Sequence, residues 1–281
     1  GFTSIFALRP AAVLLQTGRH GQSWELLFHA DRSFDKTRCS EPFEGTRIPL
    51  FKPMAKDELA GLIRDCRWTL RYWCEHSEIP IYFEDRTQRS EPLPPRSDSP
   101  FGAFQSPDSM EPSSLIETIN SPLSLRADLQ IRHQAEGVDV VVGYVGTPRF
   151  GFYNHGLTLV NTRSTDVLGE HAERLGHLGI KVRSRHLEHT LTRDNVLQDE
   201  HWSLVMTQIR ASAQQLRALL VDQIFKSRAR PEALDAWLRL LAIESQAQPL
   251  GPETGTPGTI RKHVFLPTTG GASLSLGEVD S

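Results

Sequence analysis

Short hydrophobic runs occupy the first quarter of the chain, and a helical pattern follows them. Residues 13–17 and 23–30 flank a glycine-containing turn, and residues 46–51 form a third run. Short runs of this kind, bounded by turn residues, predict strands. Residues 57–76 predict a helix with one face buried against a sheet, followed by a strand at 79–83. The helical spacing is carried by Leu59, Leu62, Ile63, Cys66, Leu70 and Trp73.

The second half of the chain repeats the order of strands followed by helices. Residues 129–133 and 138–145 predict paired strands, and the second of these is apolar on both faces, as a buried strand is. Residues 152–160 extend the sheet, and 171–178 predict a short helix that Gly179 ends. An apolar stripe from Glu200 to Phe225 predicts a long amphipathic helix, which is ordinary core packing. The pattern predicts a mixed α/β (α+β) fold.

Two polar stretches divide the chain into domains. Proline and serine dominate residues 86–118, where no hydrophobic period survives, so we expect a mobile linker. Glycine, proline and threonine dominate residues 247–281, and we expect a disordered tail there apart from a short apolar run at Val264. The predicted domains are therefore residues 1–85 and 119–228. A helical extension at 229–246 follows, with Pro231 suited to its first turn.

Composition narrows the class of protein. The 281 residues are 38% hydrophobic and 23% charged, with a net charge of -3, which is typical of a soluble globular protein. No dense basic run is present, so we expect no nucleic-acid partner. No apolar run is long enough for a membrane span, and no signal peptide opens the chain, so we expect a cytoplasmic protein without membrane contact. Because the sequence lacks an initiator methionine, we expect a fragment of a longer protein.

The cysteines and histidines indicate neither a disulfide framework nor a metal site. Cys39, Cys66 and Cys74 lack zinc spacing, and we expect them to be buried and reduced, as in a cytosolic protein. The histidine spacings fit no known metal motif, so surface histidines are favoured over metal ligands and we predict no metal site. These histidines are His171, His177, His186 and His189.

A polar segment between two hydrophobic elements, residues 187–202, contains the most distinctive candidate residue, Arg193. One interpretation is a helix start, with Thr192 as the N-cap and Asp194 in the first turn. The other is a phosphate contact, because a guanidinium is planar, permanently charged and suited to bidentate phosphate binding. The residue types alone leave both interpretations open.

Two motifs in the first domain resemble those of the GHKL (Bergerat) ATP-binding fold, which gyrase, heat-shock chaperones, histidine kinases and mismatch-repair proteins share. GFTSIFAL, at residues 1–8, looks like the glycine-phenylalanine segment that closes the phosphate lid. EGTRIPLF, at 44–51, looks like the later Gly-Thr box. The resemblance implies nucleotide contacts by Gly1, Phe2 and Thr46. Taken singly, Phe2 suits a core position and Gly45-Thr46 suits a turn before a strand.

The order of elements after the linker resembles the middle domain of the heat shock protein 90 chaperone family. That domain is an α/β sandwich of ribosomal protein S5-like type. Its arginine reaches the ATP γ-phosphate in the neighbouring domain, and its glutamine assists. By position, Arg193 and Gln198 match these catalytic residues. Asn195 and Val196 make the spacing one residue longer than in the family, which on a helix would rotate Gln198 by about 100°.

The resemblance implies an ATP-dependent molecular chaperone that uses ATP and Mg²⁺, binds unfolded client proteins during stress and forms a possible homodimer. The helix that supplies a glutamate and an asparagine to that ATP site, and the Asp-x-Gly box, have no counterpart in this sequence. We therefore expect ATP hydrolysis in an intact parent rather than in this chain alone. The alternatives are a degenerate, non-hydrolysing interaction scaffold and another ATPase of the same superfamily, such as a mismatch-repair-like one. A helix followed by Pro80-Ile81-Tyr82-Phe83 favours the chaperone branch.

Overall fold

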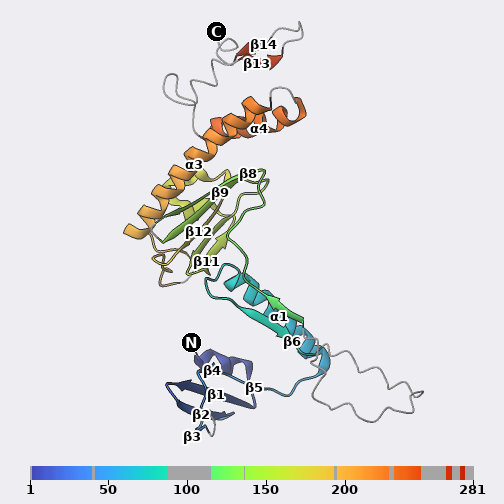
Figure 1. Cartoon of the computed structure of the whole chain (residues 1–281), viewed down its shortest axis with the longest axis vertical. Coiled ribbons are helices and arrows are strands. Elements are labelled where there is room, and N and C mark those ends of the chain that lie inside the picture. The colour runs from blue at the N-terminus through green and yellow to red at the C-terminus, as the bar shows by residue number, and fades with distance from the viewer. Residues whose placement is uncertain are drawn as a thin grey trace, which may run out of the picture. The chain divides into compact units, whose positions relative to one another are not determined.

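The computed structural model divides the chain into two compact units, Gly1–Cys66 and Arg67–Ser281, each of which is described by itself (Figure 1). This division falls before residue 85, where the sequence predicted the first boundary. The structure describes residues 2–39, 42–87, 115–135, 137–192, 195–227, 231–247, 264–267 and 273–275.

The first unit is a short 3₁₀ helix, η1 (Phe2–Leu8), and an antiparallel sheet. The strand order is β3-β2-β1-β4, with β5 also pairing with β1. Its strands are β1 (Ala12–Arg19), β2 (Gln22–His29), β3 (Phe34–Arg38), β4 (Gly45–Arg47) and β5 (Leu50–Phe51). His20 and Gly21 both have positive φ, 52° and 74°, between β1 and β2. A two-residue loop with this geometry matches the twist of the strands, which confirms the predicted turn.

The hydrophobic core of the first unit is small. Among its residues of described burial, Val13 is the only Val, Leu, Ile, Phe or Trp that is fully buried. Phe28 lies in contact with Phe6 of η1 and with Phe34 of β3, at ring-centroid distances of 5.9 Å and 5.5 Å. Phe34 nevertheless remains more than half exposed. The other Val, Leu, Ile, Phe and Trp side chains of this unit whose burial is described are half-buried or exposed.

Helix α1 (Lys56–Cys74) begins in the first unit and ends in the second. The predicted helix is confirmed, but its predicted buried face is wrong. None of its residues is fully buried, and Trp68 is 63% exposed. On the same helix, Arg67 and Arg71 form ion pairs with Glu117.

Glu117, which pairs with both arginines, lies in a two-stranded antiparallel sheet. This sheet pairs β6 (Tyr82–Asp85) with β7 (Leu115–Thr118), in the register Tyr82↔Thr118. The sequence placed residues 115–118 in the linker, whereas they form a strand here. The guanidinium of Arg67 also lies 5.0 Å from the ring centre of Phe83. Most of the predicted linker lies outside the described residues.

A five-stranded sheet forms the centre of the second unit, in the order β11-β10-β12-β9-β8. Its strands are β8 (Leu129–Ala135), β9 (Val138–Tyr144), β10 (Phe150–Asn154), β11 (Leu157–Thr162) and β12 (Leu178–Ser184). All pairs are antiparallel except β10 with β12. Every residue of β9 is buried, as its run of apolar residues predicted. The connection from β11 to β12 contains η3 (Thr165–His171) and α2 (Ala172–Leu175).

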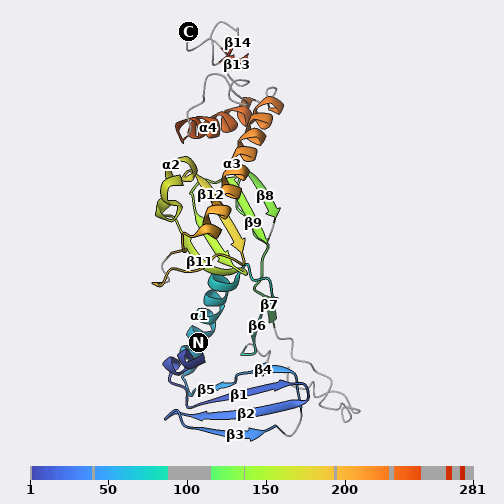
Figure 2. The ribbon, with the colours of Figure 1, turned by 90° about the vertical axis from the view of Figure 1, so that its left-hand side faces the viewer.

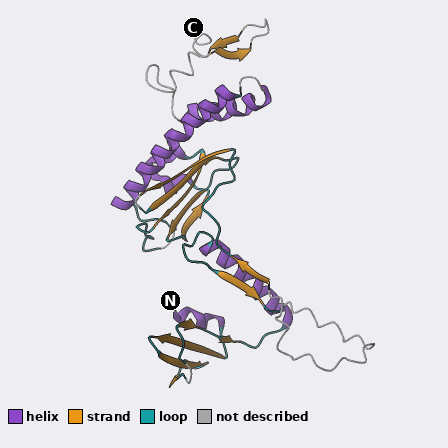
Figure 3. Ribbon diagram, viewed as in Figure 1, coloured by secondary structure: helices purple, strands orange, loops and turns teal. Residues whose placement is uncertain are grey.

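Helices cover one face of this sheet (Figure 2). The long α3 (Glu200–Lys226) packs against β8 and β9, and α4 (Pro231–Ala247) packs against α3. The core of the unit joins Val140, Val142 and Ile180 of the sheet to Met206 and Ile209 of α3. The predicted mixed α/β class and the predicted long helix are confirmed (Figure 3). Part of the predicted tail forms a strand pair, β13 (Val264–Pro267) with β14 (Ser273–Ser275), and the rest lies outside the described residues.

Candidate functional site

The structure describes only part of the predicted nucleotide site. Gly1 lies outside the described residues. Phe2 opens η1, and its side-chain environment is not described. Thr46 is exposed on β4, opposite Thr17 of β1, and the two hydroxyl oxygens are 3.3 Å apart. The structure therefore neither groups these three residues nor separates them.

The segment that contains Arg193 is a closed loop between β12 and α3. Its flanks form an antiparallel bridge between His189 and Val196. Thr190 N–H donates to the Asn195 carbonyl at 2.9 Å, and Leu197 N–H donates to the Glu188 carbonyl at 2.8 Å. We call residues 188–197 the bridged loop. Within it, Leu191 and Thr192 are exposed, while Arg193 lies outside the described residues.

Helix α3 begins after this loop, so the predicted helix start at Thr192 is wrong. Asp199 is the N-cap, and its carboxylate accepts a hydrogen bond from Trp202 N–H at 2.9 Å. Gln198 precedes the cap and is exposed, with its amide beside Gly169, where an added Cβ would lie 3.7 Å from both amide atoms. Because Gln198 is not helical, the extra residue between Arg193 and Gln198 does not rotate it by a helical step. The Thr190–Asn195 pairing stabilises a loop instead.

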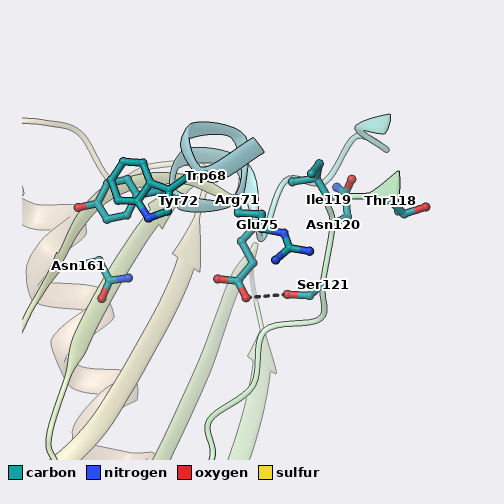
Figure 4. A pocket seen from close by; sticks show the side chains of 9 residues that line it. All are labelled: Trp68, Arg71, Tyr72, Glu75, Thr118, Ile119, Asn120, Ser121 and Asn161. Carbon is teal, nitrogen blue, oxygen red and sulfur yellow. Dashed lines mark hydrogen bonds between the residues drawn. The ribbon is translucent and has the colours of Figure 1, made fainter. Parts of the chain in front are cut away.

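A second candidate site is a pocket of about 430 Å³ in the second unit, at the end of α1 (Figure 4). The rings of Trp68 and Tyr72 stack on one side, with centroids 5.3 Å apart and planes at 12°. Glu75 projects into the centre and accepts a hydrogen bond from the Ser121 hydroxyl at 3.1 Å. The pocket is lined by Trp68, Arg71, Tyr72, Glu75, Thr118, Ile119, Asn120, Ser121 and Asn161.

His76 follows Glu75 and is only 1% exposed. Its Nε2 lies 3.0 Å from Lys181 Nζ of β12, and its Nδ1 lies 3.1 Å from the Ser121 carbonyl. A carbonyl only accepts and a charged lysine only donates, so the contacts are satisfied by a neutral imidazole with its proton on Nδ1. The ring of Tyr153 meets this imidazole edge to face, with centroids 4.7 Å apart. The pattern fixes the tautomer of a buried histidine.

The ionisable groups in this cluster are perturbed mainly by burial. Burial lowers the pKa of His76, and the nearby charge of Lys181 lowers it further against the opposing effect of the Ser121 carbonyl. Burial also lowers the pKa of Lys181, although Glu75 opposes that shift. The pKa of the Tyr153 phenol is raised by burial, and its hydroxyl has no hydrogen-bond partner within the described part of the chain. The shifts favour the uncharged forms of His76 and Tyr153, whereas Lys181 is the cation whose charge lowers the pKa of His76.

Backbone contacts hold the end of α1 against the sheet around this cluster. Ser121 N–H donates to the Glu75 carbonyl at 2.7 Å, and the Thr158 hydroxyl of β11 donates to the Tyr72 carbonyl at 2.6 Å. Gly156, in the β10–β11 turn, has a φ of 84°, and a Cβ there would lie 1.7 Å from the His76 carbonyl oxygen. Only glycine permits this close approach.

Sequence reasoning missed the pocket and the His76 cluster. The partners of His76 are distant in the sequence, 45 residues away at Ser121 and 105 residues away at Lys181. The one local signal is a histidine directly after an amphipathic helix, and that position is common on surfaces. Pairing at such separations depends on tertiary structure, which residue spacing does not encode.

Metal and membrane features are absent from the described residues. No cluster of three or more histidine, cysteine, aspartate or glutamate side chains is arranged there to hold a metal ion. The helices described above include none with the length and apolar character needed to cross a bilayer. The three cysteines are free thiols, but the expectation that they are buried is wrong, because Cys66 is exposed and Cys39 and Cys74 are half-buried. A scan of protein-family models finds no match to this chain, and a search of curated proteins finds none either.

Proposed function

We propose that this chain acts in an ATP-dependent chaperone of the heat shock protein 90 type, with its second unit serving as the middle domain. In this role Arg193 would contact the phosphate of a nucleotide held by an ATPase domain, and Gln198 would assist. Client proteins would be unfolded chains. The mixed sheet with helices on one face is compatible with the α/β middle domain that the sequence resembles.

The observation that supports this proposal best is the bridged loop. Its flanks are joined by two backbone hydrogen bonds, and Val196 anchors it in the core. Asp199 then caps α3, whose 27 residues form a rigid support. Because the loop is fixed at both ends, less conformational entropy is lost when one of its residues contacts a ligand. A guanidinium carried there would supply a permanent cation to a phosphoryl group.

The described residues of the first unit do not by themselves fit ATP. Thr46 lies on an exposed strand, and its hydroxyl faces that of Thr17. The hollow in this unit, of about 340 Å³, is lined by Leu50, Met54 and Leu62 among others rather than by Thr46. We therefore assign the binding of ATP and Mg²⁺ to an ATPase domain that contains further residues. This chain would contribute the bridged loop with Arg193.

The test is ATP hydrolysis by the protein as its native cell makes it, after its intact mass and amino-terminal sequence have been determined. Arg193→Ala is expected to lower kcat by about a thousandfold or more, as for other arginine fingers, with little change in the Kd for ATP. Arg185→Ala, an exposed arginine shortly before the loop, is the matched control and should leave kcat unchanged. An equal loss of binding and hydrolysis in Arg193→Ala, or no loss, would refute the role.

The second candidate function is a non-hydrolysing interaction scaffold. An exposed apolar surface favours it, because Tyr82 and Ile116 lie on the same face of the β6–β7 pair and are 65% and 61% exposed. Such surfaces often mark protein-binding sites. Suppression of aggregation of a denatured probe protein without ATP, lost in the variant Tyr82→Ser/Ile116→Ser, would favour the scaffold. ATP-dependent suppression would favour the chaperone.

A further inference from the structure

The end of α1 is held to the sheet by an arrangement that requires an uncharged histidine. His76 accepts a hydrogen bond from Lys181 and donates one to the Ser121 carbonyl, and it is almost fully buried. We propose that His76, Lys181 and Glu75 form a proton-operated latch. The latch keeps the end of α1 docked on the sheet while His76 is neutral, and releases it when His76 is protonated.

Protonation reverses the role of His76 Nε2. The atom that accepts from Lys181 Nζ at 3.0 Å becomes a donor, so two cationic donors face each other in a buried site. Like charges at this distance repel strongly where water is excluded. Glu75 offers the alternative partner, because its carboxylate lies 3.7 Å from the same Nε2. The protonated imidazole therefore turns away from Lys181 and toward Glu75.

The other charged groups around His76 oppose its protonation. Arg183 of β12 donates to the His76 carbonyl at 3.4 Å and is itself paired with Asp139 of β9. Tyr153 of β10 contributes an aromatic ring and a neutral phenol. Two cations, Lys181 and Arg183, thus act against one anion, Glu75. Arg183 also lies 4.0 Å from Glu78, which pairs with His155 of the β10–β11 turn.

The direction of the pH effect follows from the lowered pKa of His76. Its ordinary value is 6.5, and the docked state lowers it, so the released state binds a proton first as the pH falls. Docking is therefore strongest above about pH 6.5 and weakens progressively below it, until the docked histidine is protonated as well. Ion pairs between carboxylates and exposed arginines change little in this range, since carboxylates titrate lower.

Release would also change the pocket beside the latch. Glu75, Tyr72 and Ser121 all line it, and each takes part in the docking contacts. A rotation of Glu75 toward His76 breaks its hydrogen bond with the Ser121 hydroxyl. The pocket therefore loses one wall in the released form.

The test combines histidine NMR with amide hydrogen exchange in the full chain between about pH 7.5 and pH 5. The Cε1–Hε1 resonance of His76 reports protonation, and the amide of Ser121 reports docking because it donates to the Glu75 carbonyl. We expect both to change at the same pH, with Ser121 exchanging about tenfold faster in the acidic form after correction for intrinsic rates. A histidine that titrates without any change at Ser121 would overturn the proposal.

Three variants separate the latch from general acid instability. His76→Gln keeps an acceptor for Lys181 but cannot be protonated, so exchange at Ser121 should no longer depend on pH. Lys181→Gln keeps a donor without a charge, and should shift the histidine transition to higher pH while removing the release. His29→Gln, which replaces an exposed histidine paired with Asp35, is the control and should behave as wild type. Release at an unchanged pH in His76→Gln would contradict the mechanism, and the wild-type titration stands independently of how the variants fold.

Discussion

At the scale of single residues, Gly156 shows how one position without a side chain can determine a docking site. Gly156→Ala is expected to destabilise the second unit by more than the roughly 1–2 kcal/mol that a left-handed conformation costs, because the new Cβ would overlap the His76 carbonyl. Gly21→Ala is the matched control, since Gly21 also has a positive φ but open space around it. Urea unfolding of both variants measures the difference, and equal losses would show that the overlap is relieved without cost.

Glu244 is the most heavily hydrogen-bonded buried carboxylate that the structure describes. It is 2% exposed and accepts from Tyr144, His177 and Arg217, which belong to β9, the β12 approach and α3. Burial raises the pKa of Glu244, but the hydrogen bond from His177 and the charge of Arg217 outweigh it, so the net pKa is lowered. Its stabilisation is therefore present above the ordinary carboxylate pKa and is lost as the pH falls through the lowered value.

Replacing this carboxylate should loosen α4. Glu244→Gln is expected to lower the free energy of unfolding of the second unit at pH 7 by about 3 kcal/mol, because it removes the buried charge that accepts hydrogen bonds from the Arg217 guanidinium. Asp235→Asn on the same helix removes an exposed i,i+4 pair with Arg239 and should cost less than about 1 kcal/mol. Urea denaturation provides both values. A loss in Glu244→Gln no larger than in Asp235→Asn would mean that the apolar packing of α4, and not this carboxylate, holds the helix.

At the scale of elements, the start of α3 couples the bridged loop to the core. Asp199→Ala should cost about 1 kcal/mol, which is typical for the loss of an N-cap, because Trp202 N–H loses its acceptor. Asp222→Ala, which removes only an exposed pair with Lys226, should cost about 0.5 kcal/mol or less. Hydrogen exchange at Trp202 and Ser203 shows whether the loss is confined to the first turn. Unchanged exchange there would argue against the cap.

The elements divide into those that the sequence predicts and those that it does not. Strand β9 and helix α3 follow from hydrophobic periodicity, since each buries a continuous pattern in one core. The burial of α1 does not follow, because its apolar residues have the correct period although none of them is fully buried, and Arg67 and Arg71 on the same helix pair with Glu117. Strand β7 was not predicted, because the residues before it are polar and rich in proline and serine. The candidate site was predictable only as far as the loop that contains Arg193, whereas the His76 cluster depends on contacts made across the fold.

At the scale of the whole molecule, the two units differ in how much apolar surface they bury. The first has one fully buried Val, Leu, Ile, Phe or Trp within its described residues, whereas the second has a continuous core that joins its sheet to α3 and α4. Hydrophobic stabilisation grows with buried apolar area, so the first unit should be much the less stable. We therefore expect unfolding in two steps rather than one.

Tryptophan fluorescence can separate these steps, because Trp24 is the only tryptophan of the first unit and the other four belong to the second. Urea titration of the full chain should show a first transition that is absent in Trp24→Phe and a second transition that this variant retains. The first transition should occur at a urea concentration lower by at least about 1 M, given slopes of about 1–3 kcal/mol per molar for small domains. Trp237→Phe serves as the control and should preserve the first transition. A single transition shared by both variants would mean that the units unfold together, contrary to the difference in buried apolar surface.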